Sequence, residues 1–308
     1  MTASAVSATA AGQQSAELEG QPKKHRTPTG KRLLNASLPV YTALLVIYMF
    51  LPIAVMIIFS FNDPQGRQNI TWQGFTIQNY FDVWSRPDIT GPMLNSLLIA
   101  LGSTIVATIL GTFIGLALTR YQFRGQTPVN LLIYVPMATP EVIMGASLLA
   151  LWVSVDVARG MPTILIAHVM FCISFVVVTI RARISGFNRS LEEAAMDLGA
   201  DSLTTFRKVT LPLIFPGILA AAMLSFALSI DDYVITSFVS GQTLTFPLWV
   251  YGASRLGMPP EVNVLGTLIF VTAVVAIVAQ IWWARRRAKQ DRLIVDRPPE
   301  FAPVLPRG

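Results

Sequence analysis

The chain has 308 residues, of which 53% are hydrophobic and only 13% charged, and its mean hydropathy is +0.56. Soluble proteins carry about 25% charged residues, so this composition excludes an ordinary soluble protein and indicates an integral membrane protein. The net charge is +6. Because the basic residues lie beside apolar segments with no aromatic or groove-reading pattern, nucleic acid is excluded as a partner.

The first 36 residues are rich in Ala, Ser, Gly, Gln and Thr and then become basic, which predicts a disordered tail. An apolar run follows at 38–60. It begins too late for an ordinary signal peptide and lacks a convincing small-residue cleavage site. We therefore expect this run to remain in the protein as a transmembrane helix.

Six apolar runs are long enough to cross a bilayer as helices, which takes about 20 residues each. They lie at 38–60, 94–118, 130–153, 164–182, 212–234 and 263–284. The sequence therefore predicts an all-α membrane protein with six transmembrane helices. The second run has a small-residue face, which predicts a helix-packing contact rather than a pore lining. This face is formed by Gly102, Gly111 and Gly115.

Lysine and arginine are distributed unevenly over the connections between these runs. With a cytoplasmic N-terminus, the cytoplasmic segments hold 19 of the 23 basic residues. The outer segments hold the other four, Arg67, Arg86, Arg159 and Arg255. Because basic residues collect on the cytoplasmic side of membrane proteins, both termini and the connection 183–211 are predicted to be cytoplasmic.

Acidic residues are the ionisable groups of interest inside the predicted spans, because a buried charge is costly unless it faces a cavity or a partner. Glu141 lies in the third span, and Asp231 and Asp232 lie in the fifth. We find no lysine or arginine in the interior of a span. A path whose embedded charge is all acidic favours a cationic solute over an anion.

Each of these residues also has a simpler explanation. The sequence 139–141, Thr-Pro-Glu, is typical of a helix restart, with a glutamate favoured by the helix dipole. Asp231 and Asp232 would be hydrated at the outer surface if the fifth helix ended near Ser229. His168, inside the fourth span, is more often a hydrogen-bonded core residue than a ligand. The sequence leaves these alternatives open.

The polar stretch 190–212 separates the fourth and fifth spans. Its first half has one narrow apolar stripe at helical spacing, formed by Leu191, Ala194, Ala195 and Leu198. Gly199 is the residue expected at a left-handed helix end. The pattern predicts a helix that docks on a partner, although an amphipathic helix on the membrane surface would share it.

Reduced to its fixed positions, this stretch reads Glu193-Ala194-Ala195, three residues, Gly199, nine residues, Val209, one residue, Leu211-Pro212. It resembles the EAA loop of ABC-importer permeases, which keeps every one of these spacings and has isoleucine in place of Val209. The resemblance implies the type I ABC-importer permease fold and a loop that docks into a separate ATPase. The residues expected to couple to the ATPase are Glu193, Ala194, Ala195, Asp197, Gly199, Arg207, Leu211 and Pro212.

Other segments are similar to the spermidine/putrescine permease branch of that family, and most of all to its shorter, C-type permease. They lie at 71–75, 121–125, 168–179, 229–241 and 260–263, and the similarity covers about 38–285. The resemblance implies a polyamine importer in the bacterial inner membrane. Such an importer has an extracytoplasmic solute-binding protein, two homologous permeases and two ATPase subunits. Glu141, Asp231 and Asp232 would then lie on the substrate path.

The expected organisation is a basic cytosolic tail at 1–36, a six-helix permease domain at 37–288 that contains the loop 190–212, and a cytosolic tail at 289–308. The sequence 29–32, Thr-Gly-Lys-Arg, lacks the hydroxyl residue that follows lysine in an ATP-binding loop. Motifs for metal or hydrolytic chemistry are also missing from the sequence. We therefore expect a non-catalytic subunit without a cofactor or metal of its own, with ATP and Mg²⁺ bound by the partner ATPase.

Other functions fit parts of the sequence. An importer of the same architecture could carry ferric iron or another small solute, since iron also prefers carboxylates. A proton-coupled secondary carrier would use Glu141 and Asp231 as proton sites, but it would have no use for the loop 190–212. A membrane sensor that recruits a cytosolic partner through this loop is a third class.

Overall fold

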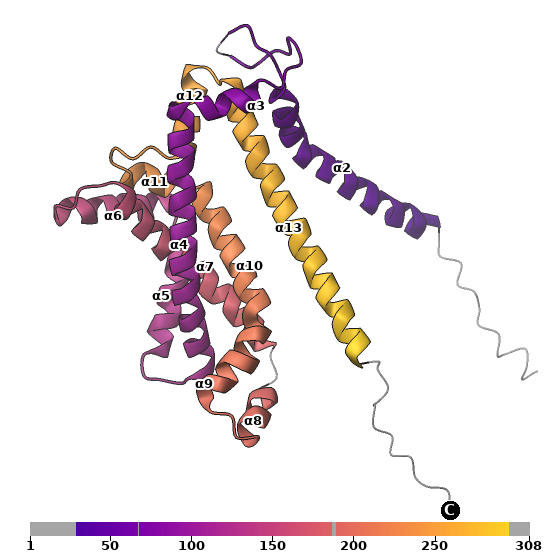
Figure 1. Ribbon diagram of the computed structural model, residues 1–308, viewed down its shortest axis with the longest axis vertical. Helices are drawn as coiled ribbons and strands as arrows, with labels where there is room; N and C mark the ends of the chain where they lie inside the picture. The colour runs from indigo at the N-terminus through magenta and orange to yellow at the C-terminus, as the bar shows by residue number, and fades with distance from the viewer. Residues whose placement is uncertain (1–28, 67, 187–188, 296–308) are drawn as a thin grey trace, which may run out of the picture. The chain divides into compact units, whose positions relative to one another are not determined.

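The computed structural model describes residues 29–66, 68–186 and 189–295 (Figure 1). The chain divides into two compact units, residues 1–55 and 56–308. All candidate site residues lie in the second unit. The predicted tails extend beyond the described residues, although helix α2 (Thr29–Phe59) begins inside the first tail and α13 (Pro260–Val295) ends inside the second.

Apart from one isolated β-bridge between Asn62 and Phe75, every regular element in the described residues is a helix. Between α2 and α13 the elements are α3 (Asn79–Asp82), η1 (Val83–Ser85), α4 (Pro87–Arg120), α5 (Gln126–Ala138), α6 (Glu141–Ser154), α7 (Met161–Ser185), α8 (Ser190–Asp197), α9 (Ser202–Thr205), the π-helical turn η2 (Phe206–Thr210), α10 (Leu211–Ile230), α11 (Val234–Val239) and α12 (Phe246–Leu256). The prediction of an all-α chain is confirmed.

Five helical segments in the described part of the chain are long and apolar enough to cross a membrane. They are Ser37–Phe59, Pro87–Arg120, Met161–Ser185, Ser202–Ile230 and Pro260–Trp283, and they correspond to five of the six predicted runs.

The remaining run, 130–153, forms two helices, α5 and α6, with a bend of 108° between them. Pro140 disfavours the helical conformation for the residue before it, and Thr139 is indeed extended, with φ −80° and ψ 130°. The run is therefore not one continuous helix, and the alternative of a helix restart at Glu141 is confirmed. The chain has up to six spans if the bent pair counts as one.

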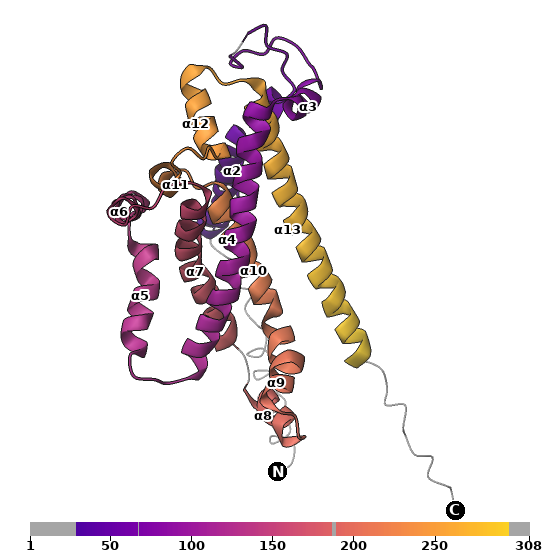
Figure 2. The same cartoon turned by 60° about the vertical axis from the view of Figure 1, so that its left-hand side comes forward.

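The core of the second unit forms where α4, α7 and α10 pack along one another (Figure 2). The small residues of α4 allow its backbone to approach α7 closely. A Cβ atom added to Gly111 would lie 2.6 Å from Val176, and one added to Gly115 would lie 3.0 Å from Ile180. The predicted packing role of this face is confirmed.

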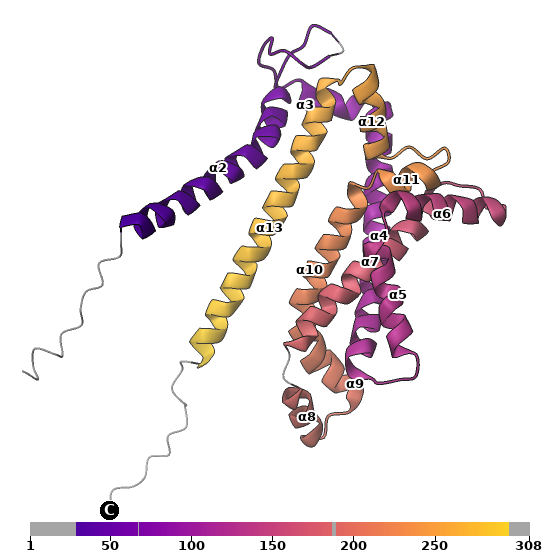
Figure 3. The same ribbon diagram turned by 180° about the vertical axis from the view of Figure 1, so that it is seen from behind.

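At one end of this core, short elements pack on the long helices (Figure 3). Helix α11 packs against α6, where Gly145 leaves room for the ring of Phe238. Helix α12 packs against α4, and the backbone N–H of Phe246 donates a hydrogen bond to Ser96 Oγ at 2.9 Å. The other end of the core carries α8 and α9, so that two groups of candidate residues lie at opposite ends of α10.

Candidate coupling and substrate sites

Helix α8 carries four of the eight residues expected to couple to an ATPase. Glu193, Ala194 and Asp197 are exposed, and Ala195 is half-buried. Gly199 follows the helix with φ +86°, the left-handed conformation that its sequence position predicts. The apolar stripe also points away from the unit, since Leu198 is 90% exposed. Exposed apolar side chains of this kind are typical of a surface that binds another protein or lies on a membrane.

The other predicted coupling residues follow α8 along the chain. Arg207 lies in η2 and is exposed. Leu211 and Pro212 begin α10, where Leu211 is half-buried and Pro212 is exposed. The eight residues thus extend from the exposed face of α8 to the first turn of a core helix.

Glu192, which the sequence did not single out, is the buried neighbour of Glu193 and is 4% exposed. Its carboxylate forms an ion pair with Arg120, the last residue of α4, and accepts a hydrogen bond from the hydroxyl of Thr210 in η2. Burial raises the pKa of this carboxyl, but the hydrogen bonds from Arg120 and Thr210 and the nearby positive charges outweigh burial and hold the pKa below its ordinary value.

The three acidic residues predicted to lie on a substrate path come together in the structure. Glu141 begins α6, and Asp231 and Asp232 lie between α10 and α11, which packs on α6. Both aspartates are close enough to Glu141 for their charges to act on it. The fifth helix ends at Ile230 rather than at 234, so the placement of both aspartates inside that helix is wrong. The alternative of an earlier helix end is confirmed, but the full hydration expected with it is wrong for Asp232, which is buried.

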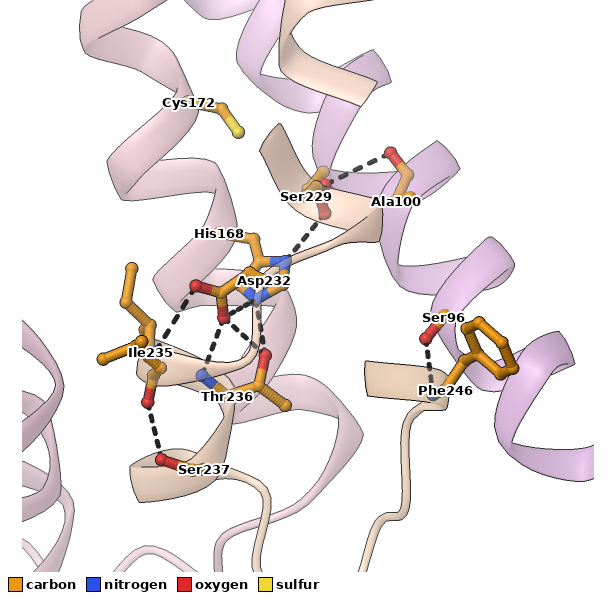
Figure 4. A network of polar contacts seen from close by, with 12 residues as sticks. Ser96, Ala100, His168, Cys172, Ser229, Asp232, Ile235, Thr236, Ser237 and Phe246 are labelled. Carbon is orange, nitrogen blue, oxygen red and sulfur yellow. Dashed lines mark hydrogen bonds and ion pairs between the residues drawn. The ribbon is translucent and has the colours of Figure 1, made fainter. Parts of the chain in front are cut away.

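Asp232 is a buried member of a polar network (Figure 4). Its carboxylate accepts hydrogen bonds from the backbone N–H of Thr236 at 2.8 Å and from the hydroxyl of Thr236 at 2.7 Å. His168 Nε2 lies 3.2 Å from the same carboxylate, and His168 Nδ1 lies 2.7 Å from Ser229 Oγ. Ser103 of α4 donates to Ser229 at 2.9 Å. The prediction that His168 is a hydrogen-bonded core residue is confirmed.

The network contains the residue types of a catalytic triad, a serine, a histidine and an aspartate. Ser229 is only 4% exposed and His168 only 3%, so a substrate carbonyl has no access to the serine hydroxyl. Satisfied hydrogen bonds of buried polar groups rigidify the segments that carry them. The network therefore holds the connection between α10 and α11 against α4 and α7.

Glu141 and Asp231, in contrast to Asp232, are exposed. Asp231 lines a surface cavity of about 450 Å³ together with Tyr233 and Tyr251. The two tyrosine rings have centroids 4.6 Å apart, and the guanidinium carbon of Arg255 lies 4.8 Å from the Tyr251 centroid. A carboxylate beside aromatic rings can bind an organic ammonium group. The sequence identified the carboxylate but not the two tyrosines.

We find no evident metal site among the described residues of this region. Among the residues with described structure, no group of three or more His, Cys, Asp or Glu side chains is arranged to hold a metal ion. Cys172 is a buried free thiol in the apolar core.

Comparison with known proteins identifies relatives over most of the chain. Residues 107–286 match the family described as binding-protein-dependent transport system inner membrane component. The spermidine/putrescine transport system permease protein PotC of Escherichia coli (strain K12) is 39% identical over 243 residues, which cover 79% of this chain and 91% of PotC. The putrescine transport system permease protein PotI of the same strain is 38% identical over 255 residues, which cover 80% of this chain and 89% of PotI.

A solved structure has a similar fold. It is that of a bacterial ABC transporter involved in the import of the acidic polysaccharide alginate, with a TM-score of 0.61 and 18% sequence identity. The match covers 86% of this chain and 99% of the alginate transporter chain. At this identity, the similarity concerns the fold alone.

Proposed function

The chain belongs to the family of binding-protein-dependent transport system inner membrane components, and we propose that it is a permease subunit of an ATP-driven importer of polyamines. The observation that carries this proposal is the 39% identity to a spermidine/putrescine permease over 79% of the chain. The exposed docking surface of α8 and the acidic residues around Asp231 support it.

In this proposal, α8 is the contact for the ATPase. Its exposed carboxylates, Glu193 and Asp197, are available to a partner, and the small side chains of Ala194 and Ala195 let a groove of that partner approach the backbone closely. Gly199, Arg207, Leu211 and Pro212 complete the coupling segment. The ATPase subunits bind ATP and Mg²⁺, and this chain supplies the docking helix and part of the path.

The cargo is a flexible cation with several ammonium groups. Each exposed carboxylate on its path lowers the electrostatic cost of moving these charges between water and the membrane interior. Glu141 and Asp231 have this role, while Asp232 holds the local structure through His168 and Thr236. The path has low affinity, and the high affinity for cargo belongs to the binding protein.

The family and the charge distribution of the chain support a proposal for the assembly. A second, homologous permease subunit completes the path across the bilayer, and an extracytoplasmic solute-binding protein delivers the cargo. Both termini and α8 lie on the cytoplasmic side of the bacterial plasma (inner) membrane, in agreement with the 19 basic residues predicted there.

A ferric-iron importer of the same architecture is the second candidate, because carboxylates also suit iron. Two observations favour the polyamine. Asp232 is already bonded to His168 and Thr236, and the ring of Tyr233 next to Asp231 suits an organic ammonium better than a hard metal ion. A proton-coupled carrier would leave the exposed docking surface of α8 without a use.

The test is uptake of labelled spermidine in cells that lack this chain, with and without the restored gene. Unlabelled putrescine and ferric citrate serve as competitors, and vanadate serves as an inhibitor of the ATPase. We expect uptake to return with the gene, to fall with putrescine and vanadate, and to be unaffected by ferric citrate. Restored cells with no spermidine uptake would contradict the polyamine assignment, and uptake insensitive to vanadate would contradict ATP coupling.

A further inference from the structure

Helix α8 is joined to the rest of its unit by a charged residue. Among its eight residues, Glu192 alone is buried. The apolar side chains of α8 are largely exposed, at 49% for Leu191 and 46% for Met196. An amphipathic helix ordinarily buries its apolar stripe against the core. The attachment of α8 to its own chain therefore depends on polar contacts.

The carboxylate of Glu192 joins α8 to two core helices at once. Arg120 ends α4, and Thr210, which is 1% exposed, lies immediately before α10. The same oxygen atom, Oε1, contacts the Arg120 guanidinium and the Thr210 hydroxyl. Because α4 and α10 pack along each other, these two contacts connect α8 to the centre of the membrane domain.

These contacts are directional, and breaking them is costly. Hydrogen bonds between charged groups are stronger than neutral ones and fix geometry, and a buried carboxylate that loses its partners keeps its desolvation cost. A groove of about 540 Å³ runs beside the ion pair, lined in part by Glu192, Met196 and Thr210. The ion pair is therefore a directional link between α8 and the ends of the core helices, beside a groove that leaves part of α8 open.

The segment between α8 and α10 has an unusual backbone. Phe206–Thr210 forms a π-helical turn, and such turns are rare and frequent at functional sites. The hydroxyl that bonds Glu192 belongs to the last residue of this turn. A displacement of α8 would therefore act on the turn and on the first residues of α10.

We propose that Glu192 is a positioning residue that transmits displacements of α8 to α4 and α10 through Arg120 and Thr210. The inference rests on the proposed function, since it requires that an ATPase moves α8. In this proposal, two adjacent glutamates have different roles. Glu193 contacts the partner subunit, and Glu192 contacts the membrane helices of its own chain.

The experiment measures spermidine uptake and ATP hydrolysis in the same proteoliposomes, which contain the complete transporter with its second permease, its ATPase and its binding protein. The variants are Glu192→Ala, Glu192→Gln and Arg120→Ala. We expect the alanine variants to move about tenfold less spermidine per ATP hydrolysed, with hydrolysis itself changed less than about twofold. Glu192→Gln keeps an oxygen acceptor without the charge and should be intermediate.

The matched control is Asp156→Asn, an exposed carboxylate at the end of α6 distant in the chain from α8. Its backbone is in the left-handed region, with φ +54°, which asparagine tolerates. Its uptake per ATP should equal that of the unmodified chain.

A charge exchange, Glu192→Arg with Arg120→Glu, should raise spermidine uptake per ATP about threefold over either single change, because it restores the ion pair in reverse.

If Glu192→Ala leaves the amount of spermidine transported per ATP hydrolysed unchanged, the inference is overturned. So would uptake and hydrolysis that fall in the same proportion in an intact complex, because this is the result of a merely structural role. A complex of the unmodified chain with no ATP-dependent spermidine uptake would overturn the proposed function and the inference with it. The two failures are therefore distinguishable.

Discussion

Two pairs of adjacent acidic residues show how environment separates identical side chains. Glu192 and Asp232 are buried and have partners within the chain, whereas Glu193 and Asp231 are exposed. A buried carboxylate must be hydrogen-bonded or paired to offset its desolvation, and both buried members are. The buried member of each pair stabilises the fold, and the exposed one remains available to a partner or a ligand.

The network of His168 offers a direct test of this division. Replacing His168 by alanine removes one partner of Asp232 and one of Ser229, so we expect the chain to lose about 2–3 kcal/mol of stability. Thr236 keeps part of the carboxylate satisfied, which limits the loss. The readout is thermal unfolding of the detergent-solubilised protein. Asp231→Asn, at an exposed position, should change stability by less than about 0.5 kcal/mol. Equal unfolding temperatures for the two variants would contradict the distinction between buried and exposed carboxylates.

The exposed carboxylates should matter for transport instead. Asp231→Asn and Glu141→Gln each remove one negative charge from the proposed path, and we expect each to lower spermidine uptake by about tenfold. Thermal unfolding should be unchanged. The measurement is initial uptake at equal membrane levels of the protein, with Asp156→Asn as the control carboxylate. Normal uptake in both variants would show that these two residues do not lie on the substrate path.

At the scale of elements, the long helices and the short helix α8 were predictable, whereas α11 and α12 were not. A run of about 20 apolar residues needs no tertiary information to be recognised, and five such runs match helices. The remaining run, 130–153, becomes α5 and α6, because two extended residues, Thr139 and Pro140, redirect the chain by 108°. Helices α11 and α12 are short and are placed by contacts with α6 and α4, which sequence spacing does not contain.

The close contact of α4 with α7 predicts a difference between two glycines of the same helix. In Gly111→Ala the new Cβ would lie 2.6 Å from Val176 Cγ1, and we expect a loss of about 1–3 kcal/mol from overpacking. In Gly91→Ala the Cβ would meet nothing within 4 Å, and alanine is the better helix former by about 1 kcal/mol. Unfolding temperatures should therefore move in opposite directions, and a loss at both sites would show that crowding is not the cause.

The ion pair of α8 predicts a pH dependence. The folded pKa of Glu192 lies below its ordinary value of 4.5, so the pair stabilises the chain above pH 4.5 and this contribution is lost as the pH falls through the folded pKa. The stability difference between the unmodified chain and Glu192→Gln should be constant from neutral pH to about 5 and shrink below it. The measurement is thermal unfolding of both proteins over this pH range. A stability difference that grows in acid would contradict a stabilising ion pair between Glu192 and Arg120.

At the scale of the whole molecule, α10 connects the two candidate sites. The coupling segment leads into its first turn and Asp231 follows its last residue. A helix of 20 residues is about 30 Å long, close to the thickness of the bilayer core. The sequence identified the exposed residues of both sites, since motif spacing and embedded charge are linear features. It missed Glu192, Tyr233 and Tyr251, whose partners lie in other helices.

The predicted orientation can be tested with single cysteines. Cys172 is the one cysteine of the sequence, so Cys172→Ser provides a cysteine-free background. In intact spheroplasts a membrane-impermeant maleimide should label Asp156→Cys and not Asp197→Cys. In inside-out vesicles the pattern should reverse, because the charge distribution predicts that α8 is cytoplasmic. Labelling of Asp197→Cys from outside would contradict this orientation.

The central claim is that this chain moves polyamines at the expense of ATP bound by another subunit. The most direct measurement is accumulation of labelled spermidine in proteoliposomes that contain the complete transporter, with and without ATP, for the unmodified chain and for Glu193→Ala. We predict ATP-dependent accumulation that Glu193→Ala reduces by at least about tenfold, because in the proposed function the exposed glutamate of α8 contacts the ATPase. Accumulation that is independent of ATP, or equal in the two proteins, would contradict the claim.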